Sequence, residues 1–533
     1  MQTPIVKGLL RAAAYPHRTR EIRLVETHIS WIFLTGDFAY KVKKPLDLGF
    51  LDFSTLELRR HFCTEELRLN RRLVPELYLD VVEIRGSVDA PLVGDGSAKR
   101  DEGDPLDYAL RMRQFDPARQ LDLELEAGSI TEADMDELAR TVATIHAAAE
   151  PAASDERWGE FQHVMEPVRA NFAAMRGASR PNGGQTQAWQ ARVDELAGRA
   201  DREGTRLSPL FAERKAGGFI RECHGDLHLS NLVRLDQGIR AFDCIEFSPA
   251  LRWIDVASDA AFLLMDLQVR GRDDLASRFA NEYLEITGDY QAIRLLDFYL
   301  AYRTLVRAKV AALRLQDAEL SADARADAAS RFEQHVSLGE RYARPRPRGV
   351  VMMSGVSGSG KSWLAQRLLA PLDAFRVRSD VERKRILGLG RFAHTESGAE
   401  AGIYTASASE ATYARLSELA AGVVAGGYPV IVDAACLGRA QREVVAAAAA
   451  AADVPCIIVE CHASEHVLER RVAKRASEGR DVSEADVAIL RRQLAAREPI
   501  EPRECETVLG VDTSRDVDLD ALVARIRGTL RSD

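Results

Sequence analysis

One short segment of the chain combines the residue types that bind a nucleotide phosphate. The run Gly355-Val356-Ser357-Gly358-Ser359-Gly360-Lys361-Ser362 matches the pattern G-x-x-x-x-G-K-S. It follows an apolar, strand-like stretch at 350–354 and leads into a helix-like stretch. In this pattern the glycines let backbone N–H groups surround a β-phosphate, the lysine reaches the β- and γ-phosphates, and the last serine gives its hydroxyl to Mg²⁺. The segment therefore predicts a nucleotide site.

A second set of reactive side chains follows the next strand-like stretch, 374–378. Asp380 and Arg383 begin the helix-like segment SDVER where that strand ends, which is the position at which open α/β sheets bind substrates. The Asp380 carboxylate can accept the proton of an attacking hydroxyl, and Arg383 can hold the substrate or stabilise the transferring phosphoryl group. The alternative interpretation is an exposed helix start with a salt bridge.

Two further features fit the same nucleotide site. Asp433 ends a third apolar stretch, 429–433, where an acid can orient Mg²⁺ and water, although a helix N-cap is equally compatible with the pattern. Arg471 and Arg475 lie one turn apart in an arginine-rich helical stretch. Two guanidinium groups on one helix face can close over ATP phosphates as a lid, and a solvated charged face is the alternative.

Together these motifs resemble those of the small P-loop kinases, a group that includes polynucleotide 5′-hydroxyl kinases, gluconate kinases and chloramphenicol phosphotransferases. The resemblance covers residues 349 to 533. It implies a parallel sheet of the adenylate-kinase type, Asp380 as the base and a hydroxyl group as the phosphate acceptor. It does not choose the acceptor.

A second constellation lies in the N-terminal half of the chain. Asp226, in the segment HGDLHLSN, is followed by Asn231 with the spacing of a protein-kinase catalytic loop, D-x-x-x-x-N, and Asp243 follows in the segment FDCIEF. In such a loop the aspartate faces the acceptor hydroxyl and the asparagine holds a metal ion, to which a strand hairpin brings the second acid. The spacing predicts a second site for a metal–nucleotide complex.

Upstream, Lys41 sits late in a strand-like stretch, where kinases carry the lysine that pairs with the α- and β-phosphates. Glu66, in the next predicted helix, is the candidate partner of this lysine, and Glu65 competes for that role. The alternatives are a surface lysine in a basic run that also holds Lys43 and Lys44, and a solvated helix face for the glutamates. Strand alternation places Lys41 and Lys43 on the same face.

These residues look like those of the aminoglycoside phosphotransferase-like branch of the protein-kinase fold. The whole chain resembles bifunctional bacterial proteins that fuse such a domain to a P-loop ATP-binding domain. The resemblance implies that Asp226 is the base, that Asn231 and Asp243 bind Mg²⁺, and that Lys41 pairs with Glu66.

The N-terminal half departs from protein kinases in one respect. The glycine motif that covers the phosphates in kinases, G-x-G-x-x-G, does not occur there, and we expect the tight turn Thr35-Gly36-Asp37 in its place. Phosphotransferases of the branch also lack this motif.

The length and the local composition divide the chain into two domains. Its 533 residues exceed the usual size of one domain, and the alternating prolines of 344–348 favour an extended linker. We predict a protein-kinase-like bilobal domain at 1–343, with a β-rich small lobe at 20–115 and a mostly helical large lobe at 116–343, followed by a P-loop domain with a parallel sheet at 349–533. The expected fold class is multidomain, α/β and α+β.

The overall composition is that of a globular protein, with 46% hydrophobic and 29% charged residues and a net charge of −9. This acidic balance argues against nucleic acid as the main partner. Seven scattered cysteines without a C-x-x-C pair argue against a disulfide framework or a zinc cage and favour a reducing compartment. We find neither a membrane-length apolar run nor a secretory signal, so we expect a cytoplasmic protein whose partners are ATP and small molecules.

The function predicted from these features is a bifunctional ATP-dependent phosphotransferase. It would use two Mg²⁺-ATP sites, each of which transfers a γ-phosphoryl group to the hydroxyl of a small-molecule acceptor. One alternative is a catalytic domain joined to a nucleotide-sensing module. Another is a 5′-hydroxyl kinase acting on nucleic acid in the P-loop half.

Overall fold

The computed structural model describes residues 3–49, 51–95, 104–176, 186–317, 319–393, 405–478 and 486–531. The chain divides into two compact units. The first unit holds Met1–Glu137, Thr144–Ala173 and Asp201–Asp266, and the second holds Leu138–Ala143, Ala174–Ala200 and Leu267–Asp533. The surface loop that the sequence predicts at 177–186 lies, except for its last residue, outside the described residues.

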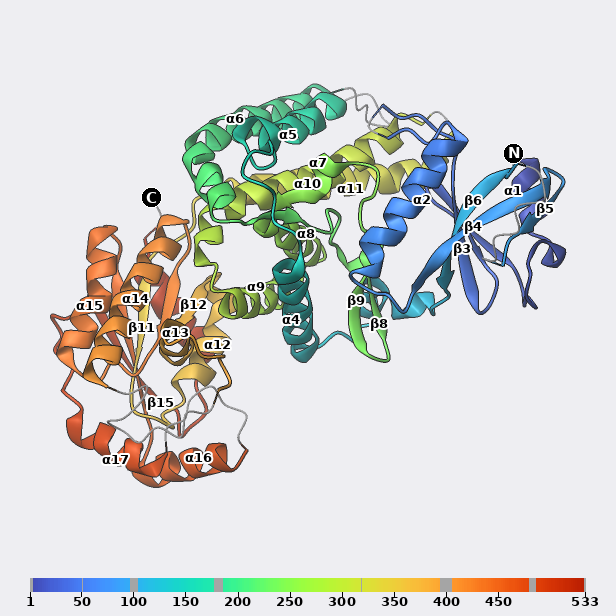
Figure 1. The fold of residues 1–533 in the computed structure, drawn as a ribbon. Coiled ribbons are helices and arrows are strands. Elements are labelled where there is room, and N and C mark those ends of the chain that lie inside the picture. Colours follow the sequence, from blue (N-terminus) through green and yellow to red (C-terminus); the bar gives the residue numbers. More distant parts are fainter. Residues whose placement is uncertain are drawn as a thin grey trace. The chain divides into compact units, whose positions relative to one another are not determined.

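The first unit begins with a six-stranded sheet in the order β1-β2-β3-β6-β4-β5, in which all neighbours are antiparallel. The strands are β1 (Arg23–Glu26), β2 (Ser30–Leu34), β3 (Phe38–Lys43), β4 (Tyr78–Ser87), β5 (Ala90–Val93) and β6 (Asp107–Arg113). The short helix α1 (Pro4–Leu9) joins the apolar core on one face of this sheet, and α2 (Leu56–Arg71) packs against β4 and β6 (Figure 1). Helix α2 begins at Leu56 because Thr55 caps it, accepting a hydrogen bond from the N–H of Leu58.

The chain after this sheet is mostly helical, as the sequence predicts. Two short antiparallel strand pairs, β7 with β10 and β8 with β9, interrupt the helices and carry the predicted catalytic segment. The elements are α3 (Leu121–Glu126), α4 (Glu132–Ala148), α5 (Phe161–Met175), α6 (Thr186–Ala216), β7 (Ile220–Glu222), β8 (Leu232–Leu235), β9 (Gly238–Ala241), α7 (Pro249–Arg252), β10 (Trp253–Asp255) and α8 (Val256–Val269).

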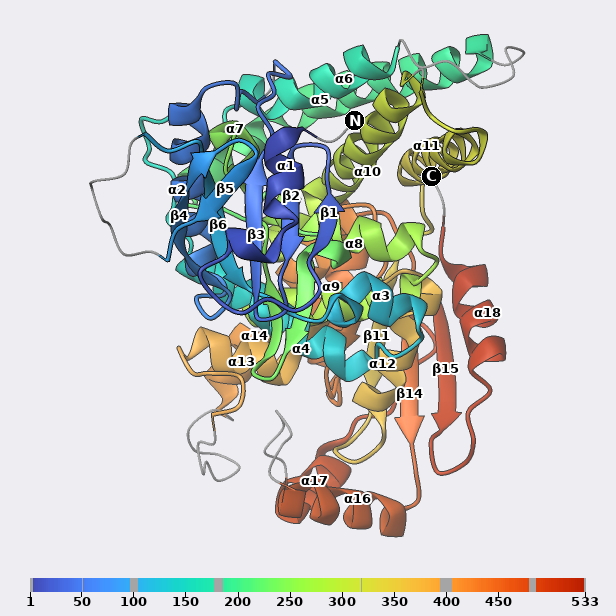
Figure 2. The same cartoon turned by 90° about the vertical axis from the view of Figure 1, so that its right-hand side faces the viewer.

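The second unit contains a five-stranded sheet in the order β12-β13-β11-β14-β15. Every neighbouring pair is parallel, which confirms the predicted parallel sheet, and Figure 2 shows β14 and β15 running in the same direction. Its strands are β11 (Val350–Ser354), β12 (Phe375–Arg378), β13 (Val430–Asp433), β14 (Cys456–His462) and β15 (Thr507–Asp512). The helices of the unit are α9 (Asp273–Thr287), α10 (Ile293–Leu315), α11 (Ala322–Tyr342), α12 (Lys361–Leu372), α13 (Ser379–Ile386), α14 (Ala406–Ala425), α15 (Arg439–Ala451), α16 (Glu465–Glu478), α17 (Val487–Ala496) and α18 (Leu519–Thr529).

The apolar strands of this sheet explain its position in the core. Every residue of β11 and β13 is buried, as expected for parallel strands that are covered on both faces. Val351, Met353, Ile457 and Val459 pack with Leu368 of α12 in one hydrophobic cluster. Because all the strands run in one direction, their carboxyl ends meet at one edge of the sheet, where the predicted nucleotide residues lie.

The proline-rich segment 344–348 lies within the second unit, together with the helices at 267–343. Arg346 is held in place by Asp297 (Nη1 to Oδ2, 2.6 Å) and by Asp373 (Nε to Oδ2, 2.8 Å), and its guanidinium lies 4.3 Å from the ring centre of Tyr428. The division into independently folding domains at this segment stays a prediction.

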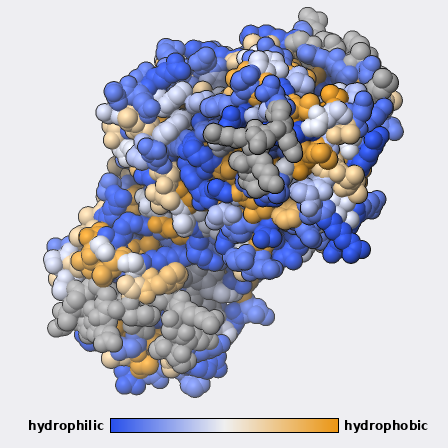
Figure 3. Space-filling view, turned by 45° about the vertical axis from the view of Figure 1, so that its right-hand side comes forward, coloured by the Kyte–Doolittle hydropathy of each residue, from blue (hydrophilic) through white to orange (hydrophobic). Residues whose placement is uncertain are grey.

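Hydrophilic residues predominate on the face of the molecule drawn in Figure 3, and hydrophobic residues show between them in separate groups. Among the described residues, the large exposed hydrophobic side chains include Leu92, Trp363 and Phe392. Trp363 belongs to the wall of the pocket described below. No helix within the described ranges combines the length and the apolar character needed to cross a membrane.

Candidate active sites

The glycine-rich run forms the loop between β11 and α12. Gly358 and Gly360 have φ angles of 80° and 83°, and an added Cβ would lie 2.9 Å from a backbone carbonyl oxygen of α16 at Gly358 and 3.0 Å from Oγ1 of Thr513 at Gly360. Glycine is therefore required at both positions, by conformation and by space. Lys361 starts α12 and donates a hydrogen bond to the carbonyl oxygen of Val356 (2.9 Å). Burial lowers the pKa of its ammonium group.

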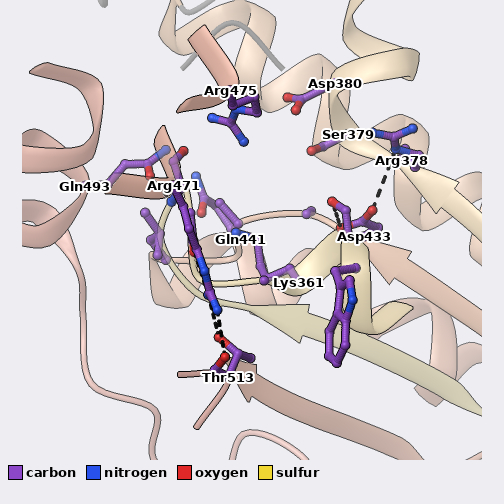
Figure 4. A pocket seen from close by; sticks show the side chains of 18 of the residues that line it. Lys361, Arg378, Ser379, Asp380, Asp433, Gln441, Arg471, Arg475, Gln493 and Thr513 are labelled. Atoms are coloured by element: carbon purple, nitrogen blue, oxygen red, sulfur yellow. Dashed lines mark hydrogen bonds and ion pairs between the residues drawn. The ribbon is translucent and has the colours of Figure 1, made fainter. Parts of the chain in front are cut away.

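A pocket of about 1230 Å³ opens beside this loop (Figure 4). The predicted residues that line it are Gly358, Gly360, Lys361, Ser362, Asp380, Arg383, Asp433, Arg471 and Arg475. Two predicted residues, Gly355 and Ser359, do not contribute to the lining; Ser359 is fully buried and its carbonyl oxygen accepts a hydrogen bond from Thr513 (2.8 Å). The structure therefore brings the separate motifs of the C-terminal half into one cavity.

The acidic end of β13 lies against the start of α12. The hydroxyl of Ser362 donates to Oδ1 of Asp433 (3.1 Å), while Oδ2 of this buried carboxylate accepts no hydrogen bond from the described residues. A hydroxyl oxygen and a carboxylate oxygen are the ligand types that Mg²⁺ prefers, so these residues fit the ion. The alternative role of Asp433 as a helix N-cap is wrong, because the next helix is capped by Gly438.

The candidate base lies in the first turn of α13. Asp380 keeps 28% of its side chain exposed and accepts a hydrogen bond from Arg383 (Oδ1 to Nη1, 3.2 Å). The salt-bridged helix start is therefore real, and both partners also line the pocket. A half-exposed carboxylate on the wall of a nucleotide pocket can accept a proton from a bound hydroxyl.

The two lid arginines differ in their contacts. Arg471 donates to Oγ1 (2.9 Å) and to the carbonyl oxygen (2.7 Å) of Thr513 and to the carbonyl oxygen of Gly358 (3.2 Å), so it joins α16 to the glycine loop. Arg475 lies one turn further along α16, near Asp380 in the close view (Figure 4). A purely solvated helix face does not describe this stretch, because both guanidinium groups contribute to the pocket wall.

In the first unit, the candidate lysine of β3 lies in a buried network of charges. Lys41 contacts Glu66 of α2 (Nζ to Oε1, 2.7 Å) and also pairs with Asp243. Although burial opposes the charge on Lys41, the carboxylates of Asp243 and Glu66 outweigh it and raise the pKa of the lysine. Glu65, which competed for the role of partner, pairs with Arg68 and Arg252 instead.

Lys43 forms the other half of this network. It contacts the second oxygen of Glu66 (Nζ to Oε2, 2.7 Å) and pairs with Glu246, and all three side chains are almost completely buried. Burial alone would raise the pKa of Glu66, but Lys41 and Lys43 lower it from 4.5 to about 2. For Glu246, burial outweighs the neighbouring lysine and raises the pKa. In the sequence analysis a surface basic run was only the alternative interpretation, and strand alternation set Lys43 on the same face as Lys41; Glu246 was given no role.

The predicted catalytic loop follows β7. The Asn231 side chain donates to the carbonyl oxygen of Asp226 (3.0 Å) and to its Oδ2 (3.2 Å), and the Nε2 atom of His228 lies 3.2 Å from the same Oδ2. Asp259 fixes the start of the loop by accepting hydrogen bonds from the backbone N–H groups of His224 (3.0 Å) and the following glycine (2.9 Å). The loop therefore holds Asp226 and Asn231 in mutual contact.

Asp243 lies close to this loop because β8 and β9 form a hairpin. The N–H of Phe242 donates to the carbonyl oxygen of Asn231 (3.0 Å), which sets Asp243 beside the asparagine. Asp243 adopts a positive φ of 64° and keeps 41% of its side chain exposed. One amide and one partly exposed carboxylate at the end of a hairpin fit Mg²⁺ ligands by donor type.

The tight turn Thr35-Gly36-Asp37 joins β2 to β3 and precedes the strand that carries the lysines. Antiparallel pairing sets Lys43 opposite Ser30, next to the turn at 27–29 between β1 and β2. The two turns therefore lie at opposite ends of β3, and the expectation that Thr35-Gly36-Asp37 takes the place of the glycine motif stays a prediction.

Replacing Glu66 by glutamine is expected to destabilise the first unit by about 3–5 kcal/mol, because two buried lysines each lose a charged partner. The pKa of Glu66 is depressed, so the stability that its carboxylate contributes is complete above its ordinary pKa of 4.5 and is lost as the pH falls toward about 2. The difference in unfolding free energy between the wild type and the variant should therefore shrink across this range. Urea unfolding at several pH values measures it.

The matched control is Glu65→Gln, one residue earlier on the same helix. Its partners are Arg68, which is half-exposed, and Arg252, which keeps a second ion pair with Glu222, so we expect a loss of about 1 kcal/mol. Equal losses in the two variants, or a difference for Glu66→Gln that does not change with pH, would contradict the assignment of the buried network.

Comparisons with known proteins found one family match and relatives that cover most of the chain. Residues 350–500 match a family described as an AAA domain. Over 477 residues, the chain is 30% identical to the uncharacterized protein Rv2004c of Mycobacterium tuberculosis and, equally, to the uncharacterized protein Mb2027c of Mycobacterium bovis. The match covers 89% of this chain and 89% of each relative. The chain belongs to the family of these mycobacterial proteins.

Two solved structures also resemble parts of this chain. A choline/ethanolamine kinase family protein from Mesorhizobium loti is 13% identical, with a TM-score of 0.36, and the match covers 63% of this chain and 99% of that one. A gluconokinase from Sinorhizobium meliloti 1021 is 22% identical, with a TM-score of 0.24, and the match covers 34% of this chain and 95% of that one. In this chain, the antiparallel sheet, helix α2 and the loop that holds Asp226 and Asn231 precede the parallel sheet with its glycine-rich loop.

Proposed function

We propose that the protein is an ATP-dependent phosphotransferase with two Mg²⁺-ATP sites, one in each unit, and that each site phosphorylates the hydroxyl group of a small molecule. The observation that carries the proposal is that both units group the same three kinds of side chain. Each has a lysine for phosphates, a carboxylate for the acceptor and oxygen ligands for a metal ion. We also propose that the nucleotide is ATP and that the protein works in the reducing cytoplasm.

In the first unit, Lys41 holds the phosphates and Asp226 accepts the proton of the acceptor hydroxyl. The acceptor oxygen forms a bond to the γ-phosphorus as the bond from that phosphorus to the β,γ-bridging oxygen breaks, and ADP leaves with the electron pair. Asn231 and Asp243 would hold Mg²⁺, which would neutralise charge that develops on the phosphate oxygens. His228, close to Oδ2 of Asp226, helps to orient the carboxylate.

In the second unit, backbone N–H groups of the glycine loop and Lys361 bind the phosphates, and Ser362 and Asp433 would hold Mg²⁺. Asp380 accepts the proton of the acceptor, with the same bonds formed and broken. Arg471 contributes positive charge from α16 beside the glycine loop, and Arg475, one turn further along, contributes it nearer to Asp380. This charge favours the transition state, in which negative charge moves toward the bridging oxygen.

The proposal is tested by counting nucleotide sites. Equilibrium dialysis of the full chain with Mg²⁺ and a non-hydrolysable ATP analogue should show two bound equivalents. Lys41→Met and Lys361→Met should each remove one of them, and the double variant should bind none. A wild-type chain that binds a single equivalent would exclude two nucleotide sites.

The class of acceptor is tested by phosphate transfer from γ-labelled ATP. We expect label to enter a pool of small hydroxyl compounds, such as sugars, amino alcohols and nucleosides. A short oligonucleotide with a 5′-hydroxyl end serves as the competing acceptor, and its exclusive labelling would overturn the small-molecule proposal for the P-loop site.

A further inference from the structure

The edge of the P-loop sheet is covered by a helix that precedes it in the chain. β12 is the outermost strand, so one side of its backbone has no neighbouring strand. The side-chain amide of Asn281, in α9, donates to the carbonyl oxygen of Ala374 (3.2 Å) and accepts from the N–H of Arg376 (2.8 Å). The hydroxyl of Tyr290 donates to the carbonyl oxygen of Arg376 (3.2 Å). These side chains supply the hydrogen bonds that another strand would make.

One turn further along α9, Glu285 binds the side chains of the same strand. Its Oε2 accepts from Nη2 of Arg376 (3.1 Å) and its Oε1 accepts from Nη1 of Arg378 (3.0 Å), and Nη1 of Arg391 lies 3.5 Å from Oε1. The carboxylate is 3% exposed. Although burial opposes ionisation, the surrounding arginines outweigh it and lower the pKa of Glu285, so a fixed negative charge faces β12.

Arg378 stands between two carboxylates. It lies opposite Asp433 in the pairing of β12 with β13, and its Nε atom is 3.7 Å from Oδ2 of Asp433 (Figure 4). This Oδ2 is the oxygen that accepts no hydrogen bond within the described part of the chain, while Oδ1 accepts from Ser362. The guanidinium of Arg378 thus lies at hydrogen-bond distance from Glu285 on one side and farther from Asp433 on the other.

We propose that Glu285 is a positioning residue of the P-loop site, which holds Arg378 away from Asp433 so that the Asp433 carboxylate can bind Mg²⁺. The inference rests on the proposed function, in which Asp433 and Ser362 hold the ion. Without the charge at Glu285, Arg378 loses one of the two carboxylates described beside it, and Asp433 is the other. Its guanidinium then occupies Oδ2 of Asp433 in a direct ion pair and competes with the metal ion for this oxygen.

The helix that carries Glu285 lies outside the residues that match the AAA domain family. Residues 350–500 match the family of AAA domains, whereas α9 ends before residue 290. If α9 only covered the sheet edge and neutralised the arginines of β12, its role would be purely structural. The position of Arg378 between Glu285 and Asp433 adds a link from this helix to the metal ligands.

The test compares Glu285→Gln with Glu282→Gln in the full-length chain. Glu282 lies one turn earlier on α9 and pairs with Arg391. Among the described interactions, none joins Glu282 to Arg378, the arginine next to Asp433. With ADP present at a fixed concentration, Mg²⁺ is titrated and the fluorescence of Trp363, in the pocket wall, is followed. We expect the apparent Mg²⁺ dissociation constant to rise about tenfold in Glu285→Gln, equivalent to about 1.4 kcal/mol, and to change less than twofold in Glu282→Gln. The same titration of a Trp363→Phe chain shows which part of the fluorescence change comes from Trp363.

A double-variant cycle separates positioning from a loss of stability. In an Arg378→Met background, Glu285→Gln should have no further effect on the Mg²⁺ constant, because the competing guanidinium is gone. An equal rise in both backgrounds, or no rise in either, would overturn the inference. A wild-type chain whose Trp363 signal does not respond to Mg²⁺ and ADP would instead contradict the proposed function of this site.

Discussion

Replacing Asp226 by asparagine is expected to lower phosphoryl transfer at the first site about 10³-fold, within the range for the loss of a general base. An amide of the same shape keeps the contact with Asn231 but accepts no proton. Binding of the Mg²⁺-ATP analogue should survive, since the phosphates are held by Lys41 and the metal ligands. Transfer of labelled phosphate to the acceptor found in the screen measures the effect, in a chain whose P-loop site carries Lys361→Met.

The matched control for this variant is Asp236→Asn, in the exposed turn between β8 and β9. The charge change is the same and the position lies in the turn of the hairpin that follows the loop of Asp226, so transfer should stay within twofold of the parent chain. Undiminished transfer by Asp226→Asn would show that Asp226 is not the base.

The second large effect is expected for Asp380→Asn in the P-loop site. Transfer there should also fall about 10³-fold, because the amide no longer takes the proton of the acceptor. Asp380 lies on the pocket wall but away from the glycine loop, so the affinity for Mg²⁺-ATP should change little. The measurement uses a chain that carries Lys41→Met, which leaves the P-loop site as the only proposed source of transfer.

Asp520→Asn provides the comparison for Asp380→Asn. Asp520 is exposed in the first turn of α18 and does not line the pocket, so the same chemical change should leave transfer unaltered. If both variants transfer phosphate at the parent rate, Asp380 has no part in proton transfer. If Asp380→Asn loses nucleotide binding as well, the residue acts on the nucleotide and its assignment as the base is wrong.

The motifs that could be predicted are those whose residues are close together in the chain. Gly355 to Ser362 and the spacing of Asp226 and Asn231 are local patterns, because one loop positions all their members. The parallel sheet could also be predicted, since its buried strands read as continuous apolar stretches followed by helices. These features depend on local backbone geometry and on burial, and both restrict the residue types that occur at neighbouring positions.

The alternatives at individual residues were resolved by packing. Asp433 fits equally well as a metal ligand or a helix cap until the structure shows that Gly438 caps the next helix. The alternation of β3 set Lys43 on the face of Lys41, but it gave no sign that its partner would be Glu246, which lies about two hundred residues further along. A buried charge is tolerated only with a partner, and the partner is chosen by the fold.

The sequence by itself determined the glycine-rich loop before α12 and the spacing of Asp226 and Asn231, and it predicted phosphate binding and catalysis there, because both are short-range patterns. Only the tertiary structure decided that Lys41 and Lys43 share Glu66, and that α9 covers the edge of the P-loop sheet with Glu285 next to Arg378. The physical reason is that the energy of an ion pair depends on distance and burial. Residues that are remote in the chain acquire both only when helices and strands pack together.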